Sequence, residues 1–196
     1  HVGRLDADKS VDRVITASAQ ILRETGAYLV IVGDGSQKSA LMKLCKSLGI
    51  ADKVKFTGSI SMQDGLPEIY RIANLFVTAS EIETQGIVLL EAAASGLPIA
   101  AVRATCIPEI VHHGVNGYLA VPGNLNELGN NIRLILSDLL KAKIMGKESR
   151  KLVELAAAQD TMGLHEKLYQ ELMLQTSTQV TREQNSEFEM ASDQIK

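Results

Sequence analysis

Tyr28-Leu-Val-Ile-Val32-Gly33-Asp34-Gly35 is the stretch that most constrains the fold of this 196-residue chain. Its first five residues form a continuous apolar run of strand length. Such a run is typical of a parallel strand that is covered on both of its faces. The two glycines then interrupt the run, so we predict a buried strand that ends in a turn at Gly33.

Helical and strand patterns alternate on both sides of this run. Apolar residues recur at helical spacing from Val11 to Leu22, and Gly26 follows as a stop signal. From Asn124 to about Gln175 the pattern predicts helix throughout. The other predicted helices are 41–48, 67–73, 87–95 and a helical turn at 108–112, and the other predicted strands are 54–56, 75–78, 99–102 and 118–121.

This alternation predicts βαβ units, and hence an α/β fold with a right-handed, doubly wound parallel sheet of the Rossmann-like type. In such sheets, ligands bind beyond the carboxyl ends of the strands. Each loop that follows a strand is therefore a candidate site. These loops are 3–10, 33–37, 58–63, 79–86 and 103–108.

The sequence divides into one domain, residues 1–175, and a polar segment, residues 176–196, for which we expect a flexible tail. His1-Val-Gly-Arg4 reads as the end of a strand that runs into a loop. Only two residues precede its glycine, whereas a strand usually has about five. We therefore expect the chain to begin inside a longer natural sequence, with its first strand truncated.

Composition argues against several classes of protein. The net charge of −3 and the 4% of aromatic residues, with no Trp, argue against nucleic acid as a partner. No apolar run approaches the roughly 20 residues of a membrane helix, and no signal peptide is recognisable. Cys45 and Cys106 lack metal or disulfide spacing, so we expect reduced thiols and a cytoplasmic protein.

Arg4 and Lys9 are two cations in the loop that follows the first strand. A diphosphate leaving group gains negative charge as its bond to a sugar breaks, and two facing cations would stabilise that charge. The alternative is ordinary solvated surface charge, which spacing alone does not exclude.

Glu83 and Glu91 are placed by the pattern near the same edge of the sheet. Glu83 falls in the loop after a strand, and Glu91 falls about two turns further, on the helix that follows. Carboxylates there can accept hydrogen bonds from the vicinal hydroxyls of a sugar or a ribose. Gly86-Ile-Val88 opens that helix, and its free N–H groups suit a phosphate. The alternative is helix capping, because acidic residues favour a first turn in any case.

Other motifs give weaker indications. Gly33-Asp-Gly35 begins like a dinucleotide fingerprint, but Lys38 replaces its third glycine, which argues against a nicotinamide enzyme. His112-His113 has no metal-binding context. Cys106 has no His–Asn arrangement and is interpreted as a packing residue. The basic stretch 141–151 predicts a solvated face, with contact to an anionic membrane as the alternative.

Taken together, these features resemble the donor domain of the family 4 glycosyltransferases, which have the two-domain GT-B fold. The decisive stretch is Glu83-Thr-Gln-Gly-Ile-Val-Leu-Leu-Glu91, a paired-glutamate signature. The resemblance covers residues 1–172 and is collinear. Its other matching stretches are Val2-Gly-Arg-Leu5 with Lys9, Val30-Ile-Val-Gly-Asp-Gly35, Val54-Lys-Phe-Thr-Gly58, Ala92–Pro98, Ile107-Pro-Glu109 and Gly114-Val-Asn-Gly117.

The resemblance implies a role for each matching residue. Arg4 and Lys9 should hold the diphosphate of the donor, and Glu83 should sit at the hydroxyls of the transferred sugar. Glu91 should bind the ribose hydroxyls. Catalysis is thus assigned to Glu83, Arg4 and Lys9, and donor binding to Arg4, Lys9, Gly58, Thr84, Gln85, Gly86, Ile87, Val88 and Glu91. Such enzymes transfer a hexose with retention and generally need no metal, so no cofactor is expected.

Two departures from the family pattern bear on specificity. Glu83-Thr-Gln-Gly86 stands where the family usually has Glu-Gly-Phe-Gly, and this variant is similar to the diacylglycerol glucosyltransferases. It favours UDP-glucose as the donor and a glycolipid as the product, with a peripheral position at the inner face of the membrane. Ala104-Thr-Cys106 replaces the usual Gly-Gly pair, which puts the backbone contacts of that loop in question.

The resemblance also implies a partner. In GT-B enzymes the acceptor binds an amino-terminal domain that this sequence lacks, so we expect the isolated chain to bind a nucleotide sugar but to transfer poorly. Two other readings remain open. One is a sugar-nucleotide epimerase of the same fold, and the other is a non-catalytic module that binds nucleotide sugars.

Overall fold

The computed structural model of the chain describes residues 1–158, in which strands and helices alternate as predicted. The strands are β1 (Leu29–Val32), β2 (Val54–Gly58), β3 (Phe76–Val77), β4 (Ile99–Val102) and β5 (Gly117–Ala120). The helices are η1 (Ala7–Lys9), α1 (Val11–Glu24), α2 (Lys38–Ser47), α3 (Leu66–Ile72), α4 (Ile87–Ala94), α5 (Ile107–Ile110), α6 (Leu125–Ser137) and α7 (Leu139–Ala158).

All strand pairs within the described residues are parallel. β1 pairs with β2, and β4 pairs with β3 on one side and with β5 on the other. The first residues of the chain lie between these two groups of strands. Val2 forms a parallel bridge to Val32, and the Nδ1 atom of His1 lies 3.2 Å from the carbonyl oxygen of Val77. The strands thus form two parallel sheets, β1-β2 and β3-β4-β5, with the N-terminal segment between them, which confirms the predicted parallel α/β fold.

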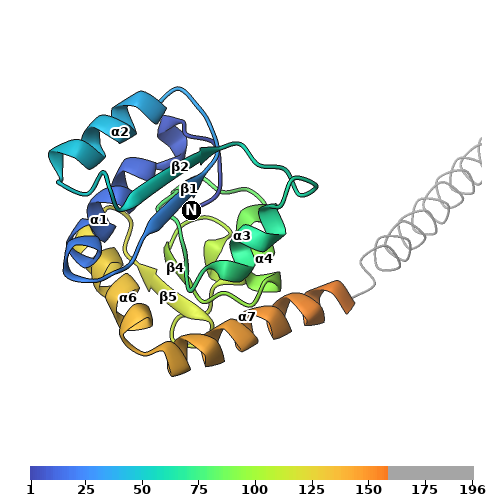
Figure 1. Cartoon of the computed structure of the whole chain (residues 1–196). Coiled ribbons are helices and arrows are strands. Elements are labelled where there is room, and N and C mark those ends of the chain that lie inside the picture. The colour runs from blue at the N-terminus through green and yellow to red at the C-terminus, as the bar shows by residue number, and fades with distance from the viewer. Residues whose placement is uncertain (159–196) are drawn as a thin grey trace, which may run out of the picture. The chain divides into compact units, whose positions relative to one another are not determined.

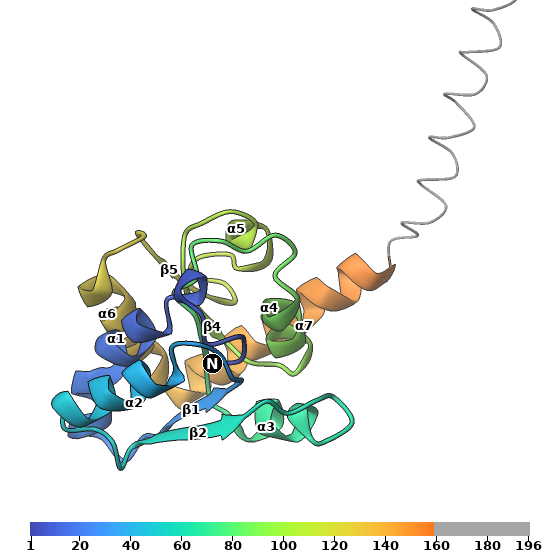
Figure 2. The same ribbon diagram turned by 90° about the horizontal axis from the view of Figure 1, so that it is seen from above.

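Helices cover both faces of the strands (Figures 1 and 2). α1, α2 and α6 lie on one face, whereas α3, α4 and α7 lie on the other. This two-sided cover explains why β4 is buried at every position and why β1, β3 and β4 are continuous apolar runs.

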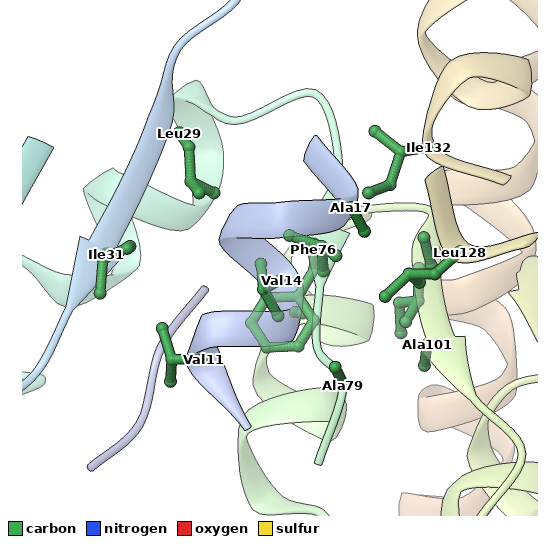
Figure 3. Close-up of a cluster of buried hydrophobic side chains, with 14 of the residues drawn as sticks. Val11, Val14, Ala17, Leu29, Ile31, Phe76, Ala79, Ala101, Leu128 and Ile132 are labelled. Carbon is green, nitrogen blue, oxygen red and sulfur yellow. The ribbon is translucent and has the colours of Figure 1, made fainter. Parts of the chain in front are cut away.

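The core on the first of these faces is centred on α1 (Figure 3). Val11, Val14 and Ala17 are buried at helical spacing along α1. They lie between the β1 side chains Leu29 and Ile31 and the α6 side chains Leu128 and Ile132. The periodicity that predicted this helix therefore reflects its burial between a strand and a second helix.

The glycines at 33 and 35 have a structural explanation. Gly33 has φ +139°, and a β-carbon there would lie 1.9 Å from the carbonyl oxygen of Gly3. A β-carbon on Gly35 would lie 2.6 Å from the backbone of Leu5. Both glycines thus allow two loops to approach each other closely, which a side chain would prevent. This packing explains why Gly33-Asp-Gly35 resembles the start of a dinucleotide-binding motif.

The predicted continuous helix after Asn124 is wrong in one respect, because it is interrupted at Asp138. That residue has φ −133° and ψ 87°, outside the helical region. Its Oδ1 atom accepts a hydrogen bond from the amide of Lys141 at 2.9 Å and so caps the start of α7. The apolar spacing continues across the break, which is why the pattern hides it. The predictions for 159–175 and 176–196 lie outside the described residues.

Candidate functional site

Two loops that the sequence marks as candidates meet at the carboxyl ends of the strands. Lys9 comes from the loop after the N-terminal segment, and Glu83 comes from the loop after β3. The Nζ atom of Lys9 lies 2.7 Å from Oε1 of Glu83, and their side chains are only 18% and 12% exposed. An ion pair shielded to this degree is screened less by salt than a surface pair. The structure therefore brings together two of the three residues to which catalysis was assigned.

This ion pair stands in the wall of a small cleft of about 140 Å³. The cleft lies where the N-terminal segment, the loop after β3 and the first turn of α4 converge. Its wall consists of His1, Val2, Gly3, Lys9, Glu83, Thr84, Gln85, Gly86, Ile87 and Val88. Seven of the residues predicted for donor binding or catalysis thus share one cleft. Gly3 was predicted only as the start of the candidate loop 3–10, and His1 and Val2 were not predicted, although their place at the end of a strand was the signal that could have identified them.

The cleft contains the amino-terminal end of α4. Gly86 precedes the helix in the left-handed conformation, with φ +62°, and no side chain caps the helix. The first amides of a helix have no acceptors within the helix, and they carry the positive end of its dipole. The cleft therefore presents an ammonium group and uncapped helix amides, which suit a negatively charged group.

Glu83 is also held through its backbone. Its amide donates a hydrogen bond to the hydroxyl of Thr105 at 3.2 Å, which ties the β3 loop to the loop after β4. Thr105 itself has φ +44°, a left-handed conformation that is uncommon for a residue other than glycine. Thr105 lies in the Ala104-Thr-Cys106 segment that departs from the family pattern, and sequence reasoning did not assign it a contact with Glu83.

Glu91 lies further along α4 and is not in the wall of the cleft. The hydroxyl of Tyr70 donates a hydrogen bond to Oε2 of Glu91 at 2.8 Å. Burial, together with this carboxylate, raises the pKa of Tyr70 far above its ordinary value. Tyr70 therefore stays a proton donor and holds the carboxylate of Glu91 in one place. Sequence reasoning missed Tyr70, which reads as an ordinary core residue of a helix.

The remaining two predicted residues lie outside the wall of the cleft. Arg4 is 67% exposed, and its guanidinium pairs with Asp6 at 2.8 Å and with Asp8 at 3.1 Å. Gly58 has φ +76°, and its carbonyl oxygen accepts a hydrogen bond from the amide of Gly33 at 2.8 Å. Their roles in donor binding stay predictions.

The other chemical candidates have structural roles. Burial, with smaller effects from Glu109 and Glu83, raises the pKa of the Cys106 thiol, so it is not activated as a nucleophile. The Nδ1 atom of His113 accepts a hydrogen bond from the amide of Leu119 at 3.1 Å. Within residues 1–158, no three His, Cys, Asp or Glu side chains are grouped as metal ligands would be. The same region contains no helix whose length and hydropathy would let it cross a bilayer.

Comparison with known proteins identifies the family and the fold. The family model described as "Glycosyl transferases group 1" matches residues 1–152. The chain is 33% identical over 174 residues to the N-acetyl-alpha-D-glucosaminyl L-malate synthase of Bacillus anthracis, covering 88% of this chain and 45% of that protein. It is 37% identical over 101 residues to the alpha-monoglucosyldiacylglycerol synthase of Streptococcus pneumoniae, covering 51% of this chain and 23% of that protein.

A similar solved structure supports the same family and fold. The crystal structure of Anabaena HepE in complex with UDP matches with a TM-score of 0.75 and 27% identity, over 88% of this chain and 47% of that one. The chain therefore spans less than half the length of each of these three proteins. It belongs to the group 1 glycosyltransferases, and it corresponds to the C-terminal, nucleotide-sugar-binding domain of their GT-B fold.

Proposed function

We propose that this chain is the donor-binding half of a retaining hexosyltransferase that uses UDP-glucose and acts on a glycolipid acceptor. The observation that carries the proposal is the cleft in which Lys9, Glu83 and the uncapped start of α4 converge. It combines groups that bind a diphosphate with a carboxylate that binds hydroxyl groups.

The diphosphate is assigned to Lys9 and to the first amides of α4. When the bond between the sugar and the diphosphate breaks, the leaving group keeps the electron pair and gains charge. An ammonium group and fixed helix amides stabilise that charge without rearranging at the moment of reaction. This supply of positive charge fits a reaction that proceeds without a bound metal. In this proposal, the guanidinium of Arg4 leaves Asp6 and Asp8 and binds phosphate oxygens of the donor instead.

The transferred sugar is assigned to Glu83 and the ribose to Glu91. Glu83 lies beside the cation that binds the diphosphate, so its carboxylate is placed to accept hydrogen bonds from sugar hydroxyls near the reacting carbon. Glu91 is held by Tyr70 with one carboxylate oxygen, which leaves the other oxygen for the vicinal hydroxyls of the ribose. Gly58 contributes backbone contacts to the base.

The identities of the donor and the acceptor are supported by relatives. HepE binds UDP in its crystal structure, and the Streptococcus relative is a glucosyldiacylglycerol synthase. The chain spans less than half of each relative, so the acceptor is assigned to an amino-terminal domain that this sequence does not include. Alone, the chain should bind the donor and transfer poorly.

Calorimetric titration of the purified chain with UDP, GDP, ADP and UDP-glucose tests the proposal. Preference for UDP and UDP-glucose is expected, with weaker binding in a Glu91→Ala variant. Binding of GDP alone would replace the assigned donor, and no binding to any nucleotide would contradict the donor-domain proposal. Epimerisation of UDP-glucose without an acceptor would favour the alternative of a sugar-nucleotide epimerase.

A further inference from the structure

The outward face of α7 combines exposed leucine and isoleucine side chains with lysines. Leu140, Lys143, Ile144 and Lys147 follow one another at positions i, i+3, i+4 and i+7, so they share one face of the helix. Leu140 is 79% exposed and Ile144 is 61% exposed. We call these four residues, together with the exposed Leu139, the α7 patch.

The opposite face of α7 fixes the helix to the domain. Ala142, Met145 and Ser149 are buried, and the hydroxyl of Ser149 donates a hydrogen bond to the carbonyl oxygen of Asn116 at 3.2 Å. A β-carbon on Gly146 would lie 2.0 Å from the carbonyl oxygen of Gly96, so the two backbones are in close contact. The α7 patch therefore cannot turn inward to bury its apolar side chains.

The charge of α7 is opposite to that of the whole chain. The helix carries five basic and two acidic residues, whereas the chain has a net charge of −3. Arg150 and Lys151 pair with Glu154 and Glu148 on the same helix, and Lys141 lies over the ring of Tyr118. Within the described part of the chain, no ion pair engages Lys143 or Lys147. Both ammonium groups are thus available to a partner with negative charge.

We propose that the α7 patch docks the domain on an anionic lipid bilayer. Leu139, Leu140 and Ile144 would enter the boundary between headgroups and acyl chains, and Lys143 and Lys147 would extend to the lipid phosphates. A protein partner is the weaker reading, because protein interfaces are depleted in lysine and favour aromatic residues and arginine. The inference deepens the proposed function, since a lipid acceptor would lie in such a surface.

Flotation of the full chain with vesicles tests the inference. Binding is expected to phosphatidylcholine vesicles that contain about a third phosphatidylglycerol, and not to phosphatidylcholine alone. At about 1 M salt, where the Debye length is about 3 Å, most of the bound protein should be released. A Lys143→Ala/Lys147→Ala variant should bind roughly twenty-fivefold more weakly, at about fivefold per lysine.

A matched variant controls for net charge. Lys43 and Lys46 are exposed on α2, outside the α7 patch, so Lys43→Ala/Lys46→Ala changes the charge equally and should bind like the unmodified chain. A Leu140→Ser/Ile144→Ser variant should also lose binding. All these side chains are exposed, so the variants should have equal melting temperatures. Equal melting temperatures would exclude unfolding as the cause of lost binding.

Three results would overturn the inference. They are equal binding to neutral and anionic vesicles, equal losses from the α2 and α7 lysine pairs, and self-association of the chain that the Leu140→Ser/Ile144→Ser variant abolishes. UDP titration of the same preparations separates this inference from the proposed function. Nucleotide binding without vesicle binding removes only the membrane inference, and vesicle binding without nucleotide binding removes only the donor site.

Discussion

Lys9 and Glu83 are 74 positions apart in the sequence, yet Nζ of Lys9 lies 2.7 Å from Oε1 of Glu83. In this form of the chain, each side chain neutralises the other. In the proposed complex a diphosphate takes over the ammonium group, and the carboxylate turns to the hydroxyls of the sugar. In this proposal, the pair links recognition of the phosphates to recognition of the sugar.

Replacing Glu83 should separate these two functions. In a Glu83→Gln variant, Lys9 loses its ionic partner and stays available to the diphosphate. UDP should bind at least as tightly as to the unmodified chain, whereas any extra affinity for UDP-glucose over UDP should fall about tenfold, since a charge-assisted hydrogen bond is lost. Calorimetric titration with both ligands measures the ratio. An unchanged ratio would show that Glu83 does not contact the sugar.

Tyr70 should control how well Glu91 binds the ribose hydroxyls. The unmodified chain is expected to prefer UDP over 2′-deoxy-UDP. A Tyr70→Phe variant frees the carboxylate from the hydroxyl that donates to it at 2.8 Å, so this preference should decrease severalfold. The variant should also lose about 1–2 kcal/mol of stability, because a hydrogen bond to a charged group is removed. If the preference persists while stability falls, the role of Tyr70 is structural only.

Gly86 should matter for binding as well as for stability. It has φ +62°, and an alanine β-carbon there would lie 2.7 Å from Cδ1 of Ile110. Gly123 is a matched control, with φ +79° and open space around it. Both Gly→Ala variants should lose about 1–2 kcal/mol of stability from the left-handed conformation. Only Gly86→Ala should also weaken UDP binding, because it displaces the first amides of α4. Equal UDP affinities in the two variants would argue against phosphate binding at α4.

Cys106 should react slowly with alkylating reagents. Burial raises the pKa of its thiol, so the reactive thiolate is a smaller fraction at pH 8 than in a free cysteine. Alkylation by iodoacetamide, followed by peptide mass spectrometry, should be slower than for glutathione, and its midpoint should lie at a higher pH. A midpoint below that of glutathione would indicate an activated thiol and reopen a catalytic role for Cys106.

The layout of the sheet could be predicted from apolar periodicity, because many residues of each strand and helix are buried and together produce the pattern. The apolar run 29–32 and the helical spacing of α1 are consequences of packing on both faces, so they are visible in the sequence. The break at Asp138 depends on one side chain that caps one amide. Nothing in the apolar pattern changes there, and the break was missed.

The candidate site was predicted in part for the same reason. Loops that follow parallel strands meet at one edge of the sheet. This rule predicted that Lys9 and Glu83 lie near each other. The hydroxyl of Tyr70 and the left-handed Thr105 act through single contacts between distant segments. Such contacts leave no periodic trace in the sequence. The exposure of Arg4 and its pairing with Asp6 and Asp8 were likewise not visible before the structure.

Titration of UDP into a Lys9→Ala variant tests the central claim most directly. Lys38→Ala is the control, because Lys38 also forms a 2.7 Å ion pair, with Asp34, but lies outside the wall of the cleft. The account predicts that UDP binds the Lys9→Ala variant at least about tenfold more weakly, as expected for a lost charge-assisted hydrogen bond, and binds the control normally. Equal UDP affinity in the unmodified chain and the Lys9→Ala variant would contradict the assignment of this cleft to the donor.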